Sequence, residues 1–153
     1  MKTAIVYYSK HHGNTRQLLD AIKKASRDEI TLLDVTETPT ADLGPYDRVG
    51  FASGIYYSKF EKRVLNFAKN NDLKGKDVFF LYTCGAEKEG YTKSIREALA
   101  GSGVNILGEY GCLGFDTFGP FKLIGGIAKN HPDEADRQKA VDFYNGLERK
   151  AGN

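Results

Sequence analysis

The sequence predicts an α/β fold: a five-stranded parallel sheet with helices on both faces, in the three-layer, doubly wound arrangement. Two observations predict it. Strand-sized apolar runs alternate with amphipathic segments along the 153 residues, an order that favours parallel strands joined by right-handed crossovers. The segment from Asp77 to Thr83 (DVFFLYT) is apolar almost throughout, as expected of a strand covered on both faces. A chain of this length supports one core, so we expect a single domain spanning residues 1–153.

Five segments have the composition of buried strands. They are Thr3 to Tyr8, Glu29 to Val35, Arg48 to Ala52, Asp77 to Thr83 and Val104 to Cys112. Four further segments have helical character. They are Asn14 to Ser26, a stretch that begins near Ser58, Tyr91 to Ala100 and Asp133 to Lys150. A polar connection runs from Pro39 to Pro45. A longer one, Gly114 to Pro132, is rich in glycine and aromatic residues, and connections of that length are usually functional or partly disordered.

Local signals indicate how the helices begin and end. Ser58 with Glu61 three residues later has the spacing of a capping box, so we expect Ser58 to cap the second helix. The last helix has acidic residues in its first turn and Arg149 and Lys150 at its end, the distribution that the helix dipole favours.

Charge, cysteine content and hydropathy argue against several classes of protein. The net charge of +2 is below that of a nucleic-acid binder. Cys84 and Cys112 form no CxxC pair, which argues against a zinc or iron–sulfur site. No run approaches the ~20 apolar residues that cross a bilayer, and Met1 is not followed by a signal-peptide pattern. We therefore expect a cytoplasmic protein with no membrane span, and in that reducing compartment no disulfide.

The strongest chemical signal is the segment Ser9 to Thr15 (SKHHGNT), which joins the first strand to the first helix. A turn at this place directs free backbone N–H groups and the positive end of the helix dipole at one point, which suits an anion. Gly13 permits close approach of the backbone. The sequence contains neither GxxxxGK[ST] nor GxGxxG, so a Walker A or dinucleotide loop is disfavoured. The alternative is an ordinary strand–helix turn capped by Asn14 or Thr15.

The nine residues YYSKHHGNT resemble the phosphate loop of flavodoxins, usually written [ST]xTGxT, with one additional residue between Ser9 and Gly13. The loop is more similar to the SxxxGxT form of flavodoxin-domain proteins akin to protoporphyrinogen oxidases of that fold. The resemblance implies a flavodoxin-like sheet of strand order 2-1-3-4-5 and FMN as the cofactor. It also implies a set of phosphate contacts. These are Ser9, Lys10, His11, His12, Gly13, Asn14 and Thr15.

Flavodoxins hold the flavin ring between the loops that follow the third and fourth strands, and the resemblance carries this role to two segments here. The first is Ser53, Gly54, Ile55 and Tyr56. The second is Thr83, Cys84 and Gly85. Both combine small residues with a nearby aromatic residue able to stack on a ring, with Tyr57 also near the first and Tyr91 following the second. The alternatives are surface packing for the tyrosines and a small buried filler for Cys84. Phe115, Phe118 and Phe121 either close over the ring or anchor the long connection.

Charges around these loops depart from the usual flavodoxin pattern, which is acidic around the flavin. Basic residues dominate the first two loops: Lys10, His11, His12, Arg16, Lys59, Lys62 and Arg63. Glu87 and Glu89 follow the third loop, so the surface is mixed. A basic rim favours acidic partners or anionic substrates, although the charges also fit an ordinary solvated surface.

Three functions fit these observations. The preferred one is an FMN-binding electron carrier that works with a reductase and an acceptor protein. The second is a small FMN-dependent oxidoreductase acting on a quinone or porphyrinogen-like substrate, with NAD(P)H as a donor. The third is a non-flavin phosphate-binding or regulatory domain of the same topology. The third is disfavoured because the acidic pair of receiver domains and the CxxxxxR motif of small phosphatases are both missing from the sequence.

Overall fold

A computed structural model describes residues 1–10, 12–116 and 125–151 of the chain. Five parallel strands form one sheet in the order β2-β1-β3-β5-β6, and a short strand, β4, pairs antiparallel to β3. The strands are β1 (Lys2–Tyr8), β2 (Glu29–Asp34), β3 (Arg48–Tyr56), β4 (Lys59–Phe60), β5 (Asp77–Cys84) and β6 (Asn105–Leu113). With the two-residue β4 set aside, this is the predicted strand order, so the predicted fold class is confirmed.

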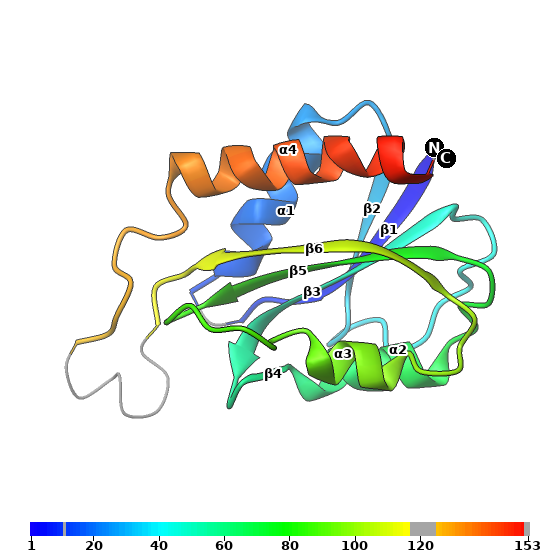
Figure 1. Cartoon of the computed structure of the whole chain (residues 1–153), viewed down its shortest axis with the longest axis horizontal. Helices are drawn as coiled ribbons and strands as arrows, with labels where there is room; N and C mark the ends of the chain where they lie inside the picture. Colours follow the sequence, from blue (N-terminus) through cyan, green and yellow to red (C-terminus); the bar gives the residue numbers. More distant parts are fainter. Residues whose placement is uncertain (11, 117–124, 152–153) are drawn as a thin grey trace.

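Helices cover both faces of the sheet, as predicted (Figure 1). Helices α1 (Asn14–Ala25) and α4 (Glu134–Ala151) lie side by side on one face. Helices α2 (Lys62–Asn70) and α3 (Lys93–Ala98) lie on the other. No helix among the described residues is both long and apolar enough to span a membrane.

Alternation along the strands divides the core into two clusters, one on each face of the sheet. In β1, Ala4 and Val6 belong to the cluster under α2 and α3, whereas Ile5 and Tyr7 belong to the cluster under α1 and α4. Successive side chains of a strand point to opposite faces, so a strand covered on both sides is apolar at every position. This requirement explains why β1 and β5 are continuous apolar runs.

The third strand is longer than the sequence indicated. We expected it to end at Ala52 with Ser53 to Tyr56 as a loop, but β3 continues to Tyr56. Ser53 and Gly54 still pair with β5, and Ile55 and Tyr56 pair with β4. The Ser-Gly pair does not break the strand because the buried Ser53 hydroxyl accepts a hydrogen bond from the Glu61 amide and donates to the Gly54 carbonyl.

The expected capping role of Ser58 is wrong. Ser58 lies with Tyr57 in the two-residue turn between β3 and β4, so it is separated from the helix by a strand. Glu61 is the N-cap of α2, and its carboxylate accepts a hydrogen bond of 2.7 Å from the Arg63 amide. The spacing of a capping box is present, but Ser58 is part of the β3–β4 turn and therefore does not cap α2.

Other boundaries shift by one or two residues. Helix α3 is shorter than expected at both ends, and Tyr91, just before it, is buried against Tyr82 at 5.6 Å between ring centroids. Strand β5 extends through Cys84, and β6 has a register irregularity opposite Val78 and Phe79. These changes leave the topology intact.

Glycines in β3 and β6 leave room for aromatic rings of β5. A Cβ atom on Gly50 would lie 2.4 Å from Cζ of Phe79. A Cβ on Gly111 would lie 2.0 Å from Cζ of Tyr82. In contrast, a Cβ on Gly146 in α4 would meet no atom within 4 Å.

Two glycine substitutions should therefore change stability in opposite directions. Gly50→Ala overpacks the core against Phe79 and should lower the free energy of unfolding by about 1–3 kcal/mol. Gly146→Ala enters open space in a helix and should raise it by about 0.5–1 kcal/mol. Urea unfolding followed by circular dichroism measures both, and equal effects of the two substitutions would contradict this account of the packing.

Candidate functional site

A narrow cavity lies at the carboxyl edge of the sheet. Four segments contribute to its wall: the start of the β1–α1 connection with the first turn of α1, the end of β3, the end of β5, and the residues after β6. We call it the sheet-edge cavity. Its lining residues are Ser9, Asn14, Thr15, Gly54, Ile55, Tyr56, Thr83, Cys84, Gly85, Gly114, Phe115 and Asp116. Ligands of open α/β sheets bind at this kind of position.

The first turn of α1 faces this cavity, and its N-cap residue makes no side-chain hydrogen bond to it. Gly13 occupies the N-cap position with a φ of 65°, a left-handed conformation that glycine adopts at little cost. Ser9 Oγ accepts a hydrogen bond of 2.9 Å from the Arg16 amide. The helix terminus therefore offers the N–H groups before Arg16 to a ligand, as an anion requires.

Two buried hydroxyls join the first helix to β5. Thr15 Oγ1 and Thr83 Oγ1 lie 2.9 Å apart, and each side chain is almost fully buried. Both residues line the cavity. This contact fixes the β5 end of the cavity against the helix terminus.

The β3 side of the cavity is closed by Tyr56. Its ring lies edge-on to that of Tyr8, with 6.1 Å between the centroids. Burial, with smaller contributions from Tyr8, Glu61 and Asp116, raises the pKa of Tyr56 to about 12. The phenol is therefore neutral near pH 7 and presents an aromatic surface with one polar end.

On the β5 side, Cys84 is buried and its thiol donates to the Cys112 carbonyl at 3.5 Å. Burial, reinforced by Glu87 and Asp116, raises the pKa of Cys84 to about 12. A neutral, buried thiol is a poor nucleophile. Cys84 and Cys112 are both free thiols in the structure, in agreement with the expectation of no disulfide.

The residues after β6 form a wall that the sequence analysis did not assign. Hydrogen bonds hold this segment, which we call the fourth wall (Gly114–Asp116). The Gly114 amide donates to the Cys84 carbonyl at 2.8 Å, the Phe115 carbonyl accepts from Asn14 Nδ2 at 2.7 Å, and Asp116 exchanges two backbone bonds with Ile127. Asp116 thereby becomes a carboxylate of the cavity lining. Its signal in the sequence was the long Gly- and aromatic-rich connection itself.

Four predicted site residues do not line the cavity, and His11 lies outside the described residues. Lys10 is exposed, with its ammonium 3.8 Å from an Asp34 carboxylate oxygen. The ring of His12 packs on Phe115 at 4.4 Å between centroids. Gly13 is the N-cap and Ser53 is buried within β3. The remaining nine predicted residues meet at the cavity.

Several residues expected in a basic rim are paired with acids. Arg16 contacts Asp20 at 2.8 Å and Arg63 contacts Glu61 at 3.3 Å. Phe115 belongs to the cavity wall, whereas Phe118 and Phe121 lie outside the described residues. The positive charge around the cavity is therefore smaller than the sequence indicated.

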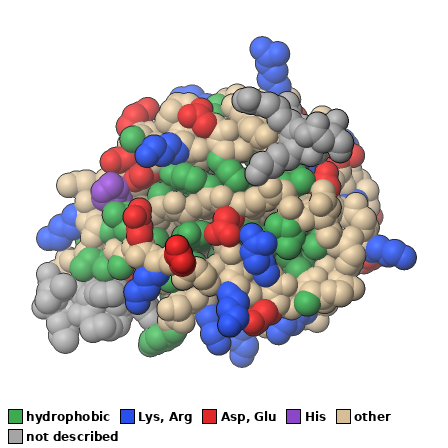
Figure 2. Space-filling view, viewed as in Figure 1, with side chains coloured by type: hydrophobic (Ala, Val, Ile, Leu, Met, Phe, Trp, Pro, Cys, Tyr) green, Lys and Arg blue, Asp and Glu red, His purple; other side chains and the backbone are tan. Residues whose placement is uncertain are grey.

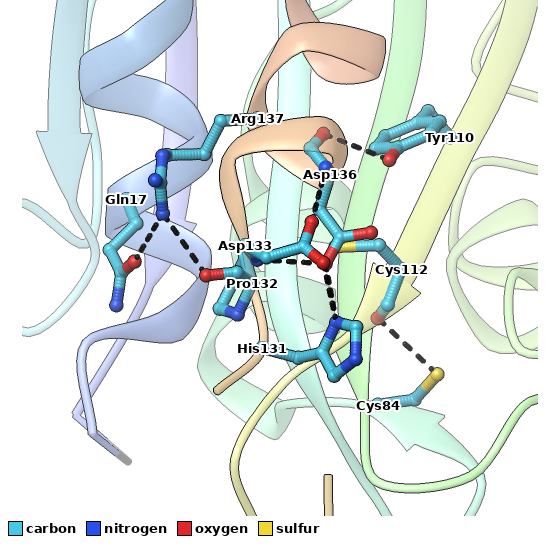
Figure 3. Close-up of polar contacts among 9 residues, drawn as sticks. All are labelled: Gln17, Cys84, Tyr110, Cys112, His131, Pro132, Asp133, Asp136 and Arg137. Carbon is cyan, nitrogen blue, oxygen red and sulfur yellow. Dashed lines mark hydrogen bonds and ion pairs between the residues drawn. The ribbon is translucent and has the colours of Figure 1, made fainter. Parts of the chain in front are cut away.

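A second polar cluster lies where the chain enters α4 (Figure 3). Asp133 and Asp136 exchange backbone-to-carboxylate hydrogen bonds of 2.9 Å at the start of α4. The ring atom Nδ1 of His131 lies 2.7 Å from Asp136 Oδ2. The His131 carbonyl accepts from the Phe115 amide at 2.8 Å. The cluster therefore helps to hold the fourth wall in place through the hydrogen bond between His131 and Phe115.

The fold and this edge together define the class. A doubly wound sheet of this order, with a helix terminus after β1 and a cavity between β3 and β5, is a flavodoxin-like arrangement. The flavodoxin domain family matches residues 5–113 of the chain. The chain therefore belongs to that family and is an FMN-binding, flavodoxin-like electron-transfer protein.

Individual proteins are similar to this chain over nearly its whole length. The chain is 37% identical over 149 residues to the uncharacterized protein MJ0298 of Methanocaldococcus jannaschii, covering 96% of this chain and 98% of that protein. Oxidised flavodoxin 1 from Bacillus cereus superimposes with a TM-score of 0.69 and 18% identity, over 97% of this chain and 98% of that one. A flavodoxin from the domain Archaea gives a TM-score of 0.64 and 16% identity, over 97% and 99%. The two structures establish the shared fold.

Two features of the lining fit FMN. The N–H groups before Arg16 at the start of α1 suit a phosphate. Tyr56 adds an aromatic ring at the same cavity. On the other side of the cavity the fourth wall packs closely on Gly85, since a Cβ there would lie 2.6 Å from Asp116 Oδ2 and 2.7 Å from Ile127 Cδ1.

Gly85→Ala should displace the fourth wall. The added methyl group overlaps Asp116 and Ile127, so their paired backbone amides should exchange hydrogen at least about tenfold faster. Gly54→Ala is the matched control, because its Cβ would lie at an ordinary 3.4 Å from the Tyr56 ring. Hydrogen exchange followed by NMR measures both, and unchanged protection in Gly85→Ala would show that the wall is not held as described.

The His131–Asp136 pair should make stability depend on pH in a defined window. The Asp136 hydrogen bond raises the pKa of His131, so this contribution is complete below the unfolded value near 6.5 and is lost as pH rises through the folded value. Burial raises the pKa of Asp136, but bonds from His131 and Asp133 outweigh it and leave that pKa lowered, so its contribution is lost in acid, below about pH 3.8.

His131→Gln should therefore lower the free energy of unfolding most near pH 5, by up to about 1 kcal/mol for such an exposed pair. The difference from the natural protein should shrink towards pH 8. Urea unfolding at pH 5 and pH 8 measures it, and a difference that grows with pH would contradict the assignment.

Proposed function

We propose that this chain is a flavodoxin-type electron carrier that holds FMN non-covalently in the sheet-edge cavity. In this proposal residues 1–153 act as one domain in the cytoplasm, with a reductase and an acceptor protein as partners. The observation that carries the proposal is the convergence of nine predicted cofactor residues at one cavity. Two buried free thiols are in keeping with a reducing compartment.

The helix terminus would hold the phosphate of FMN. Ser9, Asn14 and Thr15 lie at this end of the cavity, where Ser9 Oγ accepts from the Arg16 amide and the N–H groups before Arg16 are at the helix terminus. Lys10, His12 and Gly13 adjoin this end and stay predicted contacts, as does His11. A phosphate bound there interacts favourably with the helix dipole.

The ring would lie between the ends of β3 and β5. Gly54, Ile55 and Tyr56 form one side of the cavity, and Thr83, Cys84 and Gly85 form the other. Asp116 adds a carboxylate that the flavodoxin match does not include, since that match ends at residue 113. When bound, FMN supplies a centre that takes up and releases electrons.

The lining favours a carrier over a stand-alone oxidoreductase. Tyr56 and Cys84, each with a pKa of about 12, stay protonated near pH 7 and supply no base, which leaves Asp116 as the carboxylate of the described lining. Electron transfer through the cofactor requires neither a second pocket nor a base.

A negative charge at the phosphate loop should separate phosphate binding from ring binding. Ser9→Asp keeps an acceptor for the Arg16 amide but places a like charge beside the phosphate, so the Kd for FMN should rise about 10- to 1000-fold. The Kd for riboflavin, which has no phosphate, should not change. Ser58→Asp, in the exposed β3–β4 turn, is the control for added charge.

The measurement is a visible absorption and fluorescence titration of the purified protein, followed by a dithionite titration of the FMN complex. Failure to bind FMN, or equal loss of FMN and riboflavin in Ser9→Asp, would overturn the placement of the phosphate. Direct oxidation of NAD(P)H with a free quinone would select the oxidoreductase instead of the carrier.

A further inference from the structure

An open groove lies on the outer side of Tyr56. It is formed by the β3–β4 hairpin and the start of α2, and we call it the hairpin groove. Its lining residues are Tyr8, Tyr56, Tyr57, Lys59, Phe60, Glu61, Lys62 and Leu65. Tyr56 lines both this groove and the sheet-edge cavity. One aromatic residue therefore separates the groove from the place where the cofactor is proposed to lie.

An exposed tyrosine stands at the tip of the hairpin. The Tyr57 side chain is 83% exposed, more than any other large hydrophobic residue that the structure describes. The next most exposed is the terminal Met1, at 53%. Tyr57 and Ser58 both have positive φ, 51° and 66°. Turns of this kind favour Asn-Gly, and bulky residues adopt positive φ at a cost. The hairpin thus presents an aromatic residue to solvent in spite of its backbone preference.

The groove has a net positive charge. Lys59 and Lys62 are exposed, and neither forms an ion pair with a carboxylate of the described residues. The one acid in the lining, Glu61, is turned inwards: its carboxylate caps α2 and contacts the Arg63 guanidinium, and its side chain is only 15% exposed. Lys and Arg side chains gather along the lower edge of the molecule in Figure 2, the edge at which β4 lies in Figure 1.

The β5 side of the cavity has a net negative charge. Glu87 and Glu89 line a separate depression beside Cys84, with Lys88 between them. The two approaches to the cavity therefore differ in charge. A negatively charged molecule is attracted to the hairpin side and repelled from the β5 side.

We propose that the hairpin groove is the docking surface for an acidic redox partner protein. The inference rests on the proposed carrier function and names the partner of the same site. An exposed tyrosine beside a groove provides the aromatic anchor typical of protein interfaces, and two unpaired lysines at the rim provide electrostatic steering. The charge preference is the reverse of that of flavodoxins that are acidic around the flavin.

Electron transfer to two haem proteins of opposite charge tests the proposal. The FMN-loaded chain is reduced with dithionite, the excess is removed, and the rate of one-electron reduction of ferric to ferrous haem is followed by stopped flow. The acceptors are cytochrome b5, which is acidic, and cytochrome c, which is basic. For the unaltered chain, the rate with cytochrome b5 should fall as salt rises from low to physiological concentration, because screening weakens the attraction.

Charge reversal locates the surface. The double variant Lys59→Glu, Lys62→Glu should slow cytochrome b5 reduction about tenfold or more at low salt and accelerate cytochrome c reduction. The matched control is Lys23→Glu, Lys24→Glu, which makes the same change of net charge in the last turn of α1. The control should change either rate by less than about twofold.

A turn substitution separates docking from folding. Tyr57→Asn with Ser58→Gly fits the positive φ of both positions, so it should raise the melting temperature while slowing cytochrome b5 reduction. A stability gain with an unchanged rate would remove Tyr57 from the interface.

Four outcomes would overturn the inference. Equal effects of the two double reversals, or a rate with cytochrome b5 that rises with salt, would show that the groove is not an acidic-partner site. If Lys59→Glu, Lys62→Glu slowed the reduction of the small anion ferricyanide as strongly, the groove would be a site for small anions. If the chain were a dimer that dissociates in this variant, the groove would be an interface with a second copy. FMN uptake is measured first for the unaltered chain and for every variant. Failure of the unaltered chain to take up FMN contradicts the proposed function, whereas variants loaded with FMN test the docking surface alone.

Discussion

Parallel pairing brings the carboxyl ends of β1, β3 and β5 to one edge of the sheet, and the rest of the molecule is arranged around that edge. The pairing leaves both faces of the sheet apolar, so helices have to cover each face and two core clusters result. Those helices enter from the same edge, which is why the terminus of α1 meets the ends of β3 and β5. The Thr15–Thr83 contact joins the two at hydroxyl distance.

Neutral side chains line most of the cavity, although charged groups surround it. Tyr56 and Cys84 both resist ionisation because they are buried. Asp116 is the one carboxylate of the lining, and it contributes to raising the pKa values of both. Asp34, Asp20 and Glu61 hold the charges of Lys10, Arg16 and Arg63, whereas Lys59 and Lys62 lie on the outer side of Tyr56 in the hairpin groove.

Sequence patterns predicted the parts of this structure that depend on local chemistry. The alternation of elements and the continuous apolar runs were sufficient for a parallel sheet with helices on both faces, and the resemblance of the Ser9 to Thr15 segment supplied the strand order. The phosphate contacts of that segment stay a prediction. Sequence patterns failed where a distant contact decides. Ser53 and Gly54 continue a strand because the Glu61 amide satisfies the buried hydroxyl. Asp116 joins the lining because Gly114, Asn14 and Ile127 hold its segment in place, and nothing in residues 114–132 alone indicates that arrangement.

The two edge strands of the sheet differ in how they meet solvent. Strand β6 is nine residues long and is the last strand of the described sheet order, next to β5. Gly108, with a φ of 159°, and the register irregularity beside it interrupt the regular ladder, and the Glu109 carboxylate is held by Arg96 and Thr92. The opposite edge, β2, has only six residues. Neither edge is a long, flat template, and short or irregular edges of this kind disfavour pairing with the sheet of another molecule.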